Sequence, residues 1–420
     1  MKARFTPALF AHAETVLGLL LRFDYPADAV VSRYFREHRE LGHADRAFVA
    51  ETVFAVLRRG RSLEARCAGK LSDRNRLLVA LAVTRGWSQR ELAPVLKASE
   101  EEWLAAAKAM PESEFPPAVR CDLPDWLYDA LETQFGADEV EKLAHALNLP
   151  APLDLRVNTV KTNREALLAR LAADDIAAVP GPLSPLAVRL RDKPALAKHP
   201  LFIEGAFEVQ DEGSQLLGYL LEPKRGEMVV DFCAGAGGKT LLLGALMKNT
   251  GRLYAFDVSD KRLANLKPRL ARSGLSNVHP ARIEHERDTK IKRLAGKVDR
   301  VLVDAPCSGL GTLRRNPDLK WRQSEDSVAE LTTKQAAILD AAAKLVRPGG
   351  RVVYATCSLL TAENDAVVEG FLARHPEFTL TPASAMLAKQ GIALDGDFLR
   401  LLPHRHNTDG FFAAILDKKA

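Results

Sequence analysis

Apolar residues recur at helical spacing throughout the first quarter of the chain. In residues 45–57 they fall on or near one face of a helix. Residues 73–84 and 88–96 continue the pattern, and each stretch opens with a capping residue. We therefore predict an all-α bundle over residues 1–110.

The pattern changes after this region. Prolines between residues 111 and 117 mark a linker. The elements expected next are a strand at residues 153–158, a helix at 163–171 and strands near 187–190 and 202–204. Residues 111–207 are thus predicted to form a linker and a small α+β module that binds RNA. Arg156 and Lys161 are its candidate RNA contacts, with ordinary surface charge as the alternative.

From residue 208 to residue 420, strands and helices alternate. The expected strands lie at residues 228–232, 252–257, 278–282, 299–303, 351–354, 378–380 and 410–416. Such alternation implies a parallel, doubly wound sheet with helices on both faces. The predicted fold class is therefore α/β, with a Rossmann-like domain behind the all-α bundle and the α+β module.

Composition excludes several classes of protein. The chain of 420 residues is 47% hydrophobic and 27% charged, as is usual for a globular protein. It has no apolar run of about 18 residues that would predict a membrane span, and no secretory signal is expected. Its five cysteines are widely spaced and include no Cys-x-x-Cys pair. We therefore expect a cytoplasmic protein without a disulfide framework or a metal site.

The net charge of +5 lies entirely in the predicted bundle. Residues 1–110 hold 18 of the 59 basic and 13 of the 54 acidic residues, so the rest of the chain is balanced. Much of the excess is arginine, which suits bidentate contacts with phosphate. Acidic residues are interleaved with these arginines, so a polyanionic partner and a solvated helical surface are both compatible with the pattern.

A glycine-rich loop follows the first strand of the alternating region, over residues 231–240. Its glycines allow close approach of a ligand to the backbone at a helix N-terminus. A Walker loop would need glycine at Cys233, and a dinucleotide fingerprint would need its third glycine at Thr240. An S-adenosylmethionine loop tolerates both residues. Asp257 then ends the next strand, where it is placed to accept hydrogen bonds from ribose hydroxyls. Asp288, after the third strand, is a candidate adenine contact.

Two cysteines directly follow predicted strands. Cys307 comes after Asp304 and a proline, and Cys357 ends a second strand. Ligands bind at the carboxyl edge of open α/β sheets, so we expect these side chains to form a chemical site. A thiolate can add to C6 of cytosine and make C5 nucleophilic toward the methyl group of S-adenosylmethionine. Asp304 is suited to hydrogen-bond the N3–N4 edge of the ring, and Lys239 to lower a thiol pKa or to orient the base.

A basic loop follows the first of these thiols. Arg314, Arg315, Lys320 and Arg322 accompany Trp321, against a single acidic residue. Phosphate pairing together with stacking is how unpaired bases are held, so these five residues are candidate RNA contacts. For Trp321 alone, the alternative is a structural lid in which the tryptophan is buried. A base in a duplex would have to leave its helix, so a loop or an opened stem is the expected substrate.

From about Leu153 to its end, the chain resembles the RNA cytosine-5 methyltransferases of the Sun/Nop2 family. The resemblance rests on residues 209–215, 233–240, 304–311, 315–321, 355–358 and 409–412. It implies that Cys357, in a Thr-Cys-Ser motif, is the nucleophile and that Cys307, in a Pro-Cys motif, helps to release the product. The implied cofactor-binding residues are Cys233, Ala234, Gly235, Ala236, Gly237, Gly238, Lys239, Asp257, Asp288 and Asp304.

The chain departs from this family in two places. Gly235-Ala236 stands where Ala-Pro is commoner, a change that a glycine turn tolerates. Residues 45–58 resemble a helix of NusB-like RNA-binding domains, although the helical region looks shorter than is usual. DNA cytosine-5 methyltransferases use a Pro-Cys nucleophile, so the chemistry alone does not decide which of the two cysteines is the nucleophile. The presence of a second thiol at a strand end favours an RNA cytosine-5 methyltransferase over a DNA one.

The expected protein is therefore an S-adenosylmethionine-dependent RNA cytosine-5 methyltransferase that acts on a cytosine of 16S ribosomal RNA. We expect it to be a monomer without a membrane or metal partner. A related enzyme acting on tRNA is one alternative. A non-catalytic RNA-binding assembly factor is the other.

Overall fold

The computed structural model describes residues 5–420, which divide into two compact units. One unit contains the chain up to Pro150 together with Thr312–Glu325, and the other contains Ala151–Gly311 and Asp326–Ala420. The predicted boundary at residue 110 does not coincide with this division, because the helices that follow it belong to the N-terminal unit. The predicted boundary at residue 207 falls inside the second unit.

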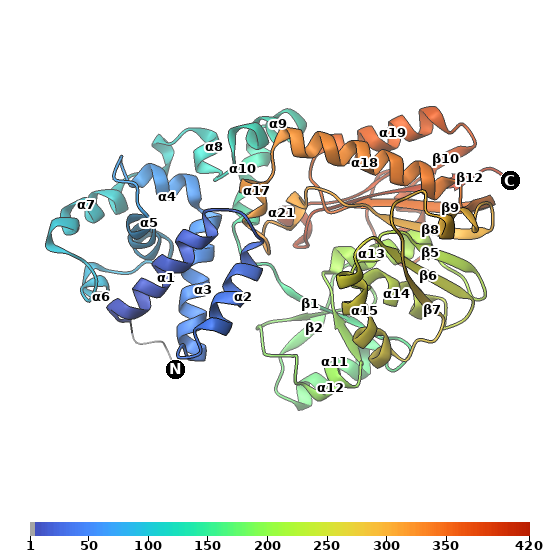
Figure 1. Cartoon of the computed structure of the whole chain (residues 1–420), viewed down its shortest axis with the longest axis horizontal. Helices are drawn as coiled ribbons and strands as arrows, with labels where there is room; N and C mark the ends of the chain where they lie inside the picture. The colour runs from blue at the N-terminus through green and yellow to red at the C-terminus, as the bar shows by residue number, and fades with distance from the viewer. Residues whose placement is uncertain (1–4) are drawn as a thin grey trace. The chain divides into compact units, whose positions relative to one another are not determined.

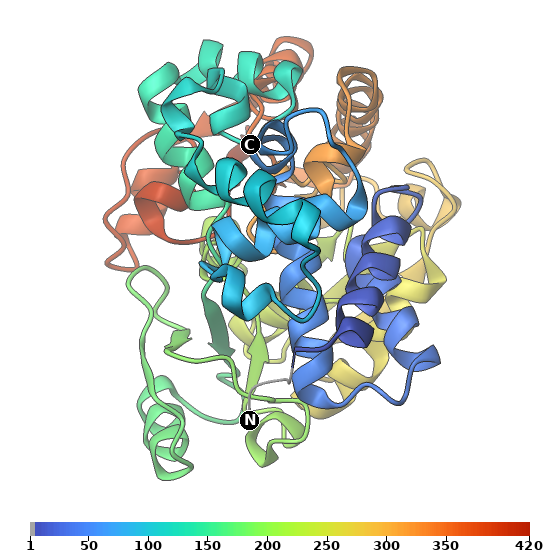
Figure 2. The same cartoon turned by 90° about the vertical axis from the view of Figure 1, so that its left-hand side faces the viewer.

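The N-terminal unit is helical, as its apolar spacing predicts (Figure 2, blue to teal). Its helices are α1 Pro7–Leu20, α2 Ala27–Glu37, α3 His43–Arg58, α4 Gly60–Arg66, α5 Asp73–Val79, α6 Gln89–Leu92, α7 Ala98–Ala109, α8 Pro117–Arg120, α9 Asp125–Phe135, α10 Ala137–Leu147 and α17 Leu319–Arg322, with a π-helical turn at Ala80–Thr84. Thr6 and Ser72 cap α1 and α5 through their hydroxyl groups. Leucine, valine and phenylalanine side chains of α1, α2, α3 and α5 form the core of this unit.

The segment Thr312–Glu325 is part of the helical unit, although its neighbours in sequence belong to the other unit. The indole Nε1 of Trp321 donates to the Leu57 carbonyl at 2.8 Å, and its ring packs on the helical core. The Lys320 ammonium donates to the Arg58 carbonyl at 2.7 Å. Asp318 accepts from the backbone N–H of Ala27, at the start of α2, at 3.2 Å. The segment therefore packs on the core of the helical unit and forms part of its fold.

These contacts correct part of the predicted RNA-binding loop. Lys320 and Arg314 are 2% and 6% exposed, and Arg314 also donates to the Pro150 carbonyl at 3.1 Å. Side chains so deeply buried in the helical unit are not available to RNA phosphates, so the prediction is wrong for both. Trp321 packs as a structural tryptophan, which was the alternative prediction for this residue. Arg315 and Arg322 are only partly buried, and for them RNA contact stays a prediction.

Burial of Lys320 is balanced by a buried acid. Desolvation lowers the pKa of Lys320 to about 8, whereas the nearby Asp122 carboxylate favours the charged ammonium. Asp122 is itself fully buried and accepts hydrogen bonds from the backbone N–H and the hydroxyl of Ser62. Burial raises the pKa of Asp122, and Lys320 opposes that shift. The Arg59 guanidinium, 3.5 Å from Asp122 Oδ2, also stabilises this buried carboxylate.

The second unit contains a small antiparallel sheet in the order β2-β3-β1-β4. Its elements are β1 Leu153–Val157, α11 Arg164–Ala173, β2 Ala178–Pro180, β3 Ala187–Leu190, α12 Pro200–Ile203 and β4 Phe207–Val209. The strand predicted at residues 202–204 is wrong. Pro200 occupies the first turn of α12 and His199 accepts from the Leu201 N–H, so this stretch begins a helix instead.

The main sheet of the second unit has the order β10-β12-β9-β8-β5-β6-β7, with β11 paired to β12. Its strands are β5 Met228–Asp231, β6 Arg252–Asp257, β7 Val278–Arg282, β8 Val298–Asp304, β9 Val346–Thr356, β10 Phe378–Thr381, β11 Leu399–Leu401 and β12 Phe411–Lys418. The strands from β5 to β9 are parallel, as predicted, but β12 pairs antiparallel with β9, β10 and β11 and so runs in the opposite direction. The sheet is therefore mixed.

Helices cover both faces of this sheet, which confirms the predicted Rossmann-like fold (Figure 1). The helices are α13 Glu212–Leu221, α14 Gly238–Leu246, α15 Asp260–Ser273, α16 Thr289–Lys292, α18 Glu325–Ala343, α19 Asp365–Arg374, α20 Ala383–Ala388 and α21 Pro403–His406. The first three lie on one face, and α18 and α19 lie on the other. The strand order reverses between β5 and β8, which is where ligands bind in doubly wound sheets.

None of the helices in residues 5–420 has the length and apolar character that a membrane crossing would need.

The position of Trp321 can be tested through Gly60. A Cβ at Gly60 would lie 2.9 Å from Cζ2 of the Trp321 ring. Gly60→Ala should therefore destabilise the helical unit by about 1–3 kcal/mol, as overpacking does. In a Trp321→Ala background the same change should be neutral or stabilising, because alanine is the better helix former.

Tryptophan fluorescence during urea unfolding measures this cycle, since all four tryptophans (Trp87, Trp103, Trp126 and Trp321) belong to the helical unit. An equal cost of Gly60→Ala in both backgrounds would contradict the packing and leave Trp321 available to stack on a base.

Candidate active site

Parallel pairing of β8 with β9 brings the two predicted thiols together. Asp304 lies opposite Ala355 in the register, so the loops that follow both residues leave the sheet side by side. The Sγ atoms of Cys307 and Cys357 are 3.4 Å apart. Both cysteines are only partly buried. Two thiols that are distant in sequence thus form a pair at the edge of the sheet.

Two glycines allow these loops to pack closely. The backbone N–H of Gly311 donates to the Cys357 carbonyl, and the N–H of Gly410 donates to the Gly311 carbonyl, each at 2.8 Å. A Cβ at Gly311 would lie 2.3 Å from the Gly410 carbonyl oxygen and 2.8 Å from that of Cys357. Only glycine fits at this position, so the backbone itself holds the two thiol loops together.

Lys239 and Asp304 form an ion pair at the same edge. Lys239 Nζ is 2.6 Å from Asp304 Oδ2 and also lies over the Phe411 ring, 5.6 Å from its centroid. Burial alone would lower the pKa of Lys239, but the charge and hydrogen bond of Asp304 raise it above its ordinary value, with a smaller contribution from Cys357. The lysine therefore stays charged and orients the Asp304 carboxylate.

The surroundings of the Cys307 thiol disfavour its ionised form. The hydrogen bond to Cys357, burial and the charges of Cys357 and Glu363 raise the pKa of Cys307 well above its ordinary value. The two sulfur atoms lie within hydrogen-bonding distance, and either thiol can be the donor. The third cysteine of this region, Cys233, also has a raised pKa, because it is buried among the carboxylates of Asp231, Asp304 and Asp257.

The glycine loop joins β5 to α14 and is held by Asp257. Gly235 has a positive φ of 56°, donates to Asp257 Oδ2 at 2.8 Å and has open space where a Cβ would stand. Asp257 Oδ1 accepts from the Ser259 N–H at 2.8 Å. Gly237, at φ 83°, caps α14, and a Cβ there would lie 2.1 Å from a Leu266 methyl carbon. The loop thus presents backbone to open space beside an acidic side chain.

Asp231 belongs to this site but was not among the predicted cofactor-binding residues, although it begins the predicted glycine-rich loop. It is fully buried at the end of β5, and its Oδ2 accepts from the Thr240 hydroxyl at 2.7 Å. Its Oδ1 is buried without a protein partner among the described residues. Burial, together with the charge of Asp304, raises the pKa of Asp231 to about 7. A strand-end acid just before a glycine loop was the signal that could have identified it.

Two arginines from other elements hold the glycine loop, and one of them corrects a prediction. Arg156 on β1 is 3% exposed, and its Nη1 donates to the Gly238 carbonyl at 2.6 Å. Arg269 on α15 donates to the Ala236 carbonyl at 2.7 Å and pairs with Glu208. The prediction of Arg156 as an RNA contact is therefore wrong, because this side chain anchors the loop from inside. Lys161 is mostly exposed, and its assignment stays a prediction.

Asp288 serves as the cap of α16. Its Oδ1 accepts from the Lys290 N–H at 2.8 Å and its Oδ2 from the Glu284 N–H at 3.0 Å. These backbone hydrogen bonds lower the pKa of Asp288 below its ordinary value. Asp288 thus orders the turn after β7, and its contact with adenine stays a prediction.

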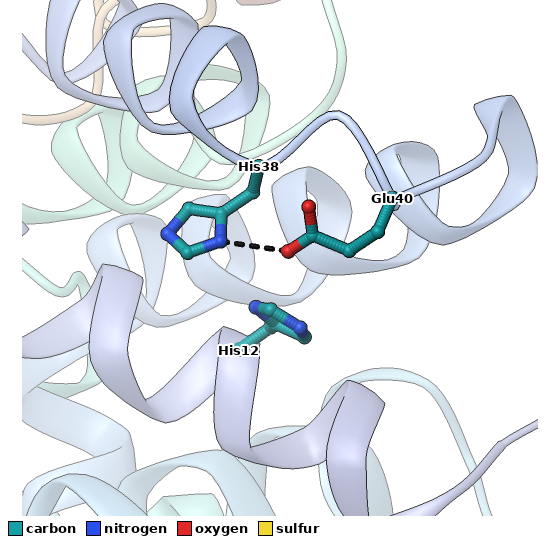
Figure 3. Close-up of side chains that lie close together, drawn as sticks. All are labelled: His12, His38 and Glu40. Carbon is teal, nitrogen blue, oxygen red and sulfur yellow. Dashed lines mark hydrogen bonds and ion pairs between the residues drawn. The ribbon is translucent and has the colours of Figure 1, made fainter.

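One group in the helical unit has the composition of a metal site. His12 on α1, His38 and Glu40 each offer one ligand atom, and these atoms all lie within 4.8 Å of one another (Figure 3). His38 Nδ1 already lies 2.8 Å from Glu40 Oε1, and His12 Nδ1 lies 2.8 Å from the Tyr34 hydroxyl. Structural zinc sites are closed by four protein ligands, whereas this group offers three and one is exposed. The polar groups of His12, His38 and Glu40 already have protein partners in these two contacts.

The raised pKa of Asp231 makes a prediction for stability. Its folded pKa of about 7 lies above the ordinary value of 3.8, so the folded protein binds more protons than the unfolded chain between these values. The contribution of Asp231 to stability is therefore complete below about pH 4 and is lost as the pH rises toward 7. Asp231→Asn cannot ionise and should raise the melting temperature, relative to wild type, by several degrees more at about pH 8 than at about pH 5.

Scanning calorimetry of the full chain without cofactor measures this difference. Asp326→Asn, at an exposed carboxylate on α18, is the matched control and should leave the pH dependence unchanged. Parallel pH profiles of Asp231→Asn and wild type would contradict the burial argument.

Comparison with known proteins identifies the family. Residues 218–417 match the family described as 16S rRNA methyltransferase RsmB/F, and residues 123–196 match the ferredoxin-like domain of RsmF/B-like methyltransferases. The chain is 34% identical to the probable ribosomal RNA small subunit methyltransferase B of Synechocystis sp., covering 96% of this chain and 98% of that protein.

Solved structures agree with this match. The crystal structure of PH0851 covers 100% of both chains with a TM-score of 0.81 and 28% identity. A methyltransferase homolog protein from Pyrococcus horikoshii covers 74% of this chain and 100% of its own, with a TM-score of 0.63 and 29% identity. The chain therefore belongs to the RsmB/F family of 16S rRNA methyltransferases, which confirms the Sun-type family that its motifs predict.

Proposed function

We propose that the protein is an S-adenosylmethionine-dependent RNA cytosine-5 methyltransferase that modifies a cytosine of 16S ribosomal RNA through a covalent cysteine–C6 adduct. The observation that carries the proposal is the pair of thiols, 3.4 Å apart, beside the Lys239–Asp304 ion pair at the point where the strand order reverses. Addition of a thiolate to a pyrimidine requires a thiol and a polar partner for the ring at the same place.

The glycine loop and its neighbours fit the proposed cofactor. Gly235 leaves open space along the loop, Asp231 Oδ1 is a buried acceptor in need of a donor, and Asp257 ends the adjacent strand. An amino group and ribose hydroxyls are donors that suit these acceptors. When bound, S-adenosylmethionine supplies an electrophilic methyl group. The chain's part is to hold it through residues 233–239, Asp231 and Asp257.

Cys357 is the proposed nucleophile. Its thiolate forms a bond to C6 of cytosine, and the electron pair of the C5–C6 double bond makes C5 nucleophilic. The Asp304 carboxylate, oriented by Lys239, accepts hydrogen bonds from N4–H and from a protonated N3, which favours the ring form that accepts the thiolate. The ranking of the two cysteines follows the Thr-Cys-Ser and Pro-Cys motifs, and the Cys307 sulfur lies 3.4 Å from that of Cys357.

Cys307 is assigned to product release. In that step C5 loses its proton to a base, the C5–C6 double bond forms again and the electron pair of the S–C6 bond returns to Cys357. Cys307 lies beside the sulfur that must leave, so its S–H is placed to assist the departure.

Covalent trapping tests both assignments. Wild type, Cys307→Ala and Cys357→Ala are each mixed with unmodified small-subunit rRNA and S-adenosylmethionine. A denaturation-resistant RNA–protein band should accumulate with Cys307→Ala and be absent with Cys357→Ala. Methyl transfer by Cys357→Ala should fall by more than about a thousandfold, since the nucleophile is lost. Cys121→Ala, at a buried cysteine of the helical unit, is the matched control and should retain activity.

Other outcomes separate the alternatives. The opposite pattern of adducts would exchange the roles of the two cysteines. Nucleoside mass spectrometry that finds 5-methylcytosine in tRNA but not in rRNA would replace the substrate. The absence of both an adduct and methyl transfer, with RNA still bound, would leave a binding protein.

A further inference from the structure

Glu363 is a buried carboxyl group that lies between the two thiol loops. Its side chain is fully inaccessible to solvent. Its Oε1 accepts from the backbone N–H of Ser308, next to Cys307, at 2.8 Å. Its Oε2 accepts from the hydroxyls of both Ser308 and Ser358, the latter next to Cys357. One carboxyl group thus binds the residue that follows each thiol.

Gln335 on α18 extends this arrangement. Its amide nitrogen donates to Glu363 Oε1 and to the Pro306 carbonyl, each at 3.0 Å. Pro306 directly precedes Cys307, so the Pro-Cys-Ser turn is held on both sides of its thiol. We refer to Glu363, Gln335, Ser308 and Ser358 as the Glu363 clasp.

The backbone behind the clasp is also held in place. The Tyr354 hydroxyl donates to the Glu363 carbonyl at 2.6 Å. Asn364 accepts from the Thr356 hydroxyl at 2.5 Å, and its amide donates to the Ser358 carbonyl at 3.2 Å. These contacts involve the residues on either side of Cys357. The short helical turn that carries Glu363, Thr361–Glu363, is therefore fixed against both the strand and the loop.

A buried carboxyl group is expensive unless its oxygens are satisfied, and apolar side chains would fill the same space at lower cost. Here Ser308, Ser358 and Gln335 all donate to it, and they reach it from β8, β9 and α18 or the loops that follow them. Hydrogen bonds to a charged acceptor are short and directional, so they fix positions that apolar packing would leave loose.

From these contacts we infer that Glu363 is a positioning residue that holds Cys307 and Cys357 at reacting distance. The inference rests on the proposed function, in which both thiols act on one cytosine. Glu363 touches neither sulfur and acts through Ser308 and Ser358.

The charge of Glu363 has a second, separable effect. It is one of the groups that raise the pKa of Cys307. Removing the charge while keeping the clasp should therefore lower the pH at which Cys307 begins to react. Glutamine can do this, because its oxygen can take the N–H donors at Oε1 while the serine hydroxyls rotate to accept from its amide.

The test measures the thiol pair without RNA. Diamide accepts two electrons and two protons from Cys307 and Cys357 as their disulfide forms, and peptide mass spectrometry follows the rate in the full chain. Glu363→Ala should slow this reaction at least about tenfold, because disulfide formation demands a specific geometry. Glu363→Gln should stay within about threefold of wild type and shift the pH profile of Cys307 alkylation downward.

A matched control separates positioning from general loss of stability. Glu212 is equally buried in the same unit and also accepts backbone N–H groups, from Leu183 and Ser184. Glu212→Ala should lower the melting temperature yet leave the rate of disulfide formation near that of wild type. Ser358→Ala, which removes a single arm of the clasp, should give an intermediate rate and serves if Glu363→Ala does not fold.

Methyl-transfer kinetics complete the test. With rRNA, Glu363→Ala should lower kcat by about a hundredfold with little change in KM, and Glu363→Gln should restore most of it. Disulfide formation and kcat at wild-type levels in Glu363→Ala would overturn the inference. Slowed disulfide formation in Glu363→Ala, in a protein whose wild type methylates no RNA, would support the clasp and overturn the proposed function.

Discussion

The pairing of β8 with β9 is the constraint on which the rest of the site depends. Because Asp304 lies opposite Ala355, the Pro-Cys and Thr-Cys loops begin at the same level of the sheet. The parallel pairing of β5 with β8 adds the glycine loop to this edge. A shift of the register would separate the thiols and change which side chains face the ligand. The chemistry thus depends on backbone hydrogen bonds as much as on the reactive side chains.

Buried polar groups then refine this coarse placement. Gly311 lets the two thiol loops touch, and Glu363 joins the serines that follow each cysteine. Arg156 and Arg269 hold the glycine loop through its carbonyls. Each of these contacts removes a polar group from water and requires a matched partner. Such networks tolerate few arrangements, and this is how a site on loops becomes rigid.

The helical unit includes a segment that follows Cys307 closely in sequence. Thr312–Glu325 contributes Asp318 to the start of α2, Lys320 to the end of α3 and Trp321 to the core. The chain therefore passes from one unit to the other and back between the two thiol motifs. Arg314, Lys320 and Trp321, which were predicted to contact RNA, instead pack within the helical unit.

Local patterns in the sequence determined the alternating strands and helices, the strand-end cysteines, the glycine loop and the family. Periodicity, turn residues and motif spacing act over short distances and need no partner. Only the tertiary structure decided that Arg156 and Lys320 are buried, that β12 is antiparallel and that Glu363 joins two loops. The sequence does not reveal whether a charged side chain faces water or a buried partner, because its burial depends on residues far away along the chain. Pairing of distant groups is a property of the folded chain alone.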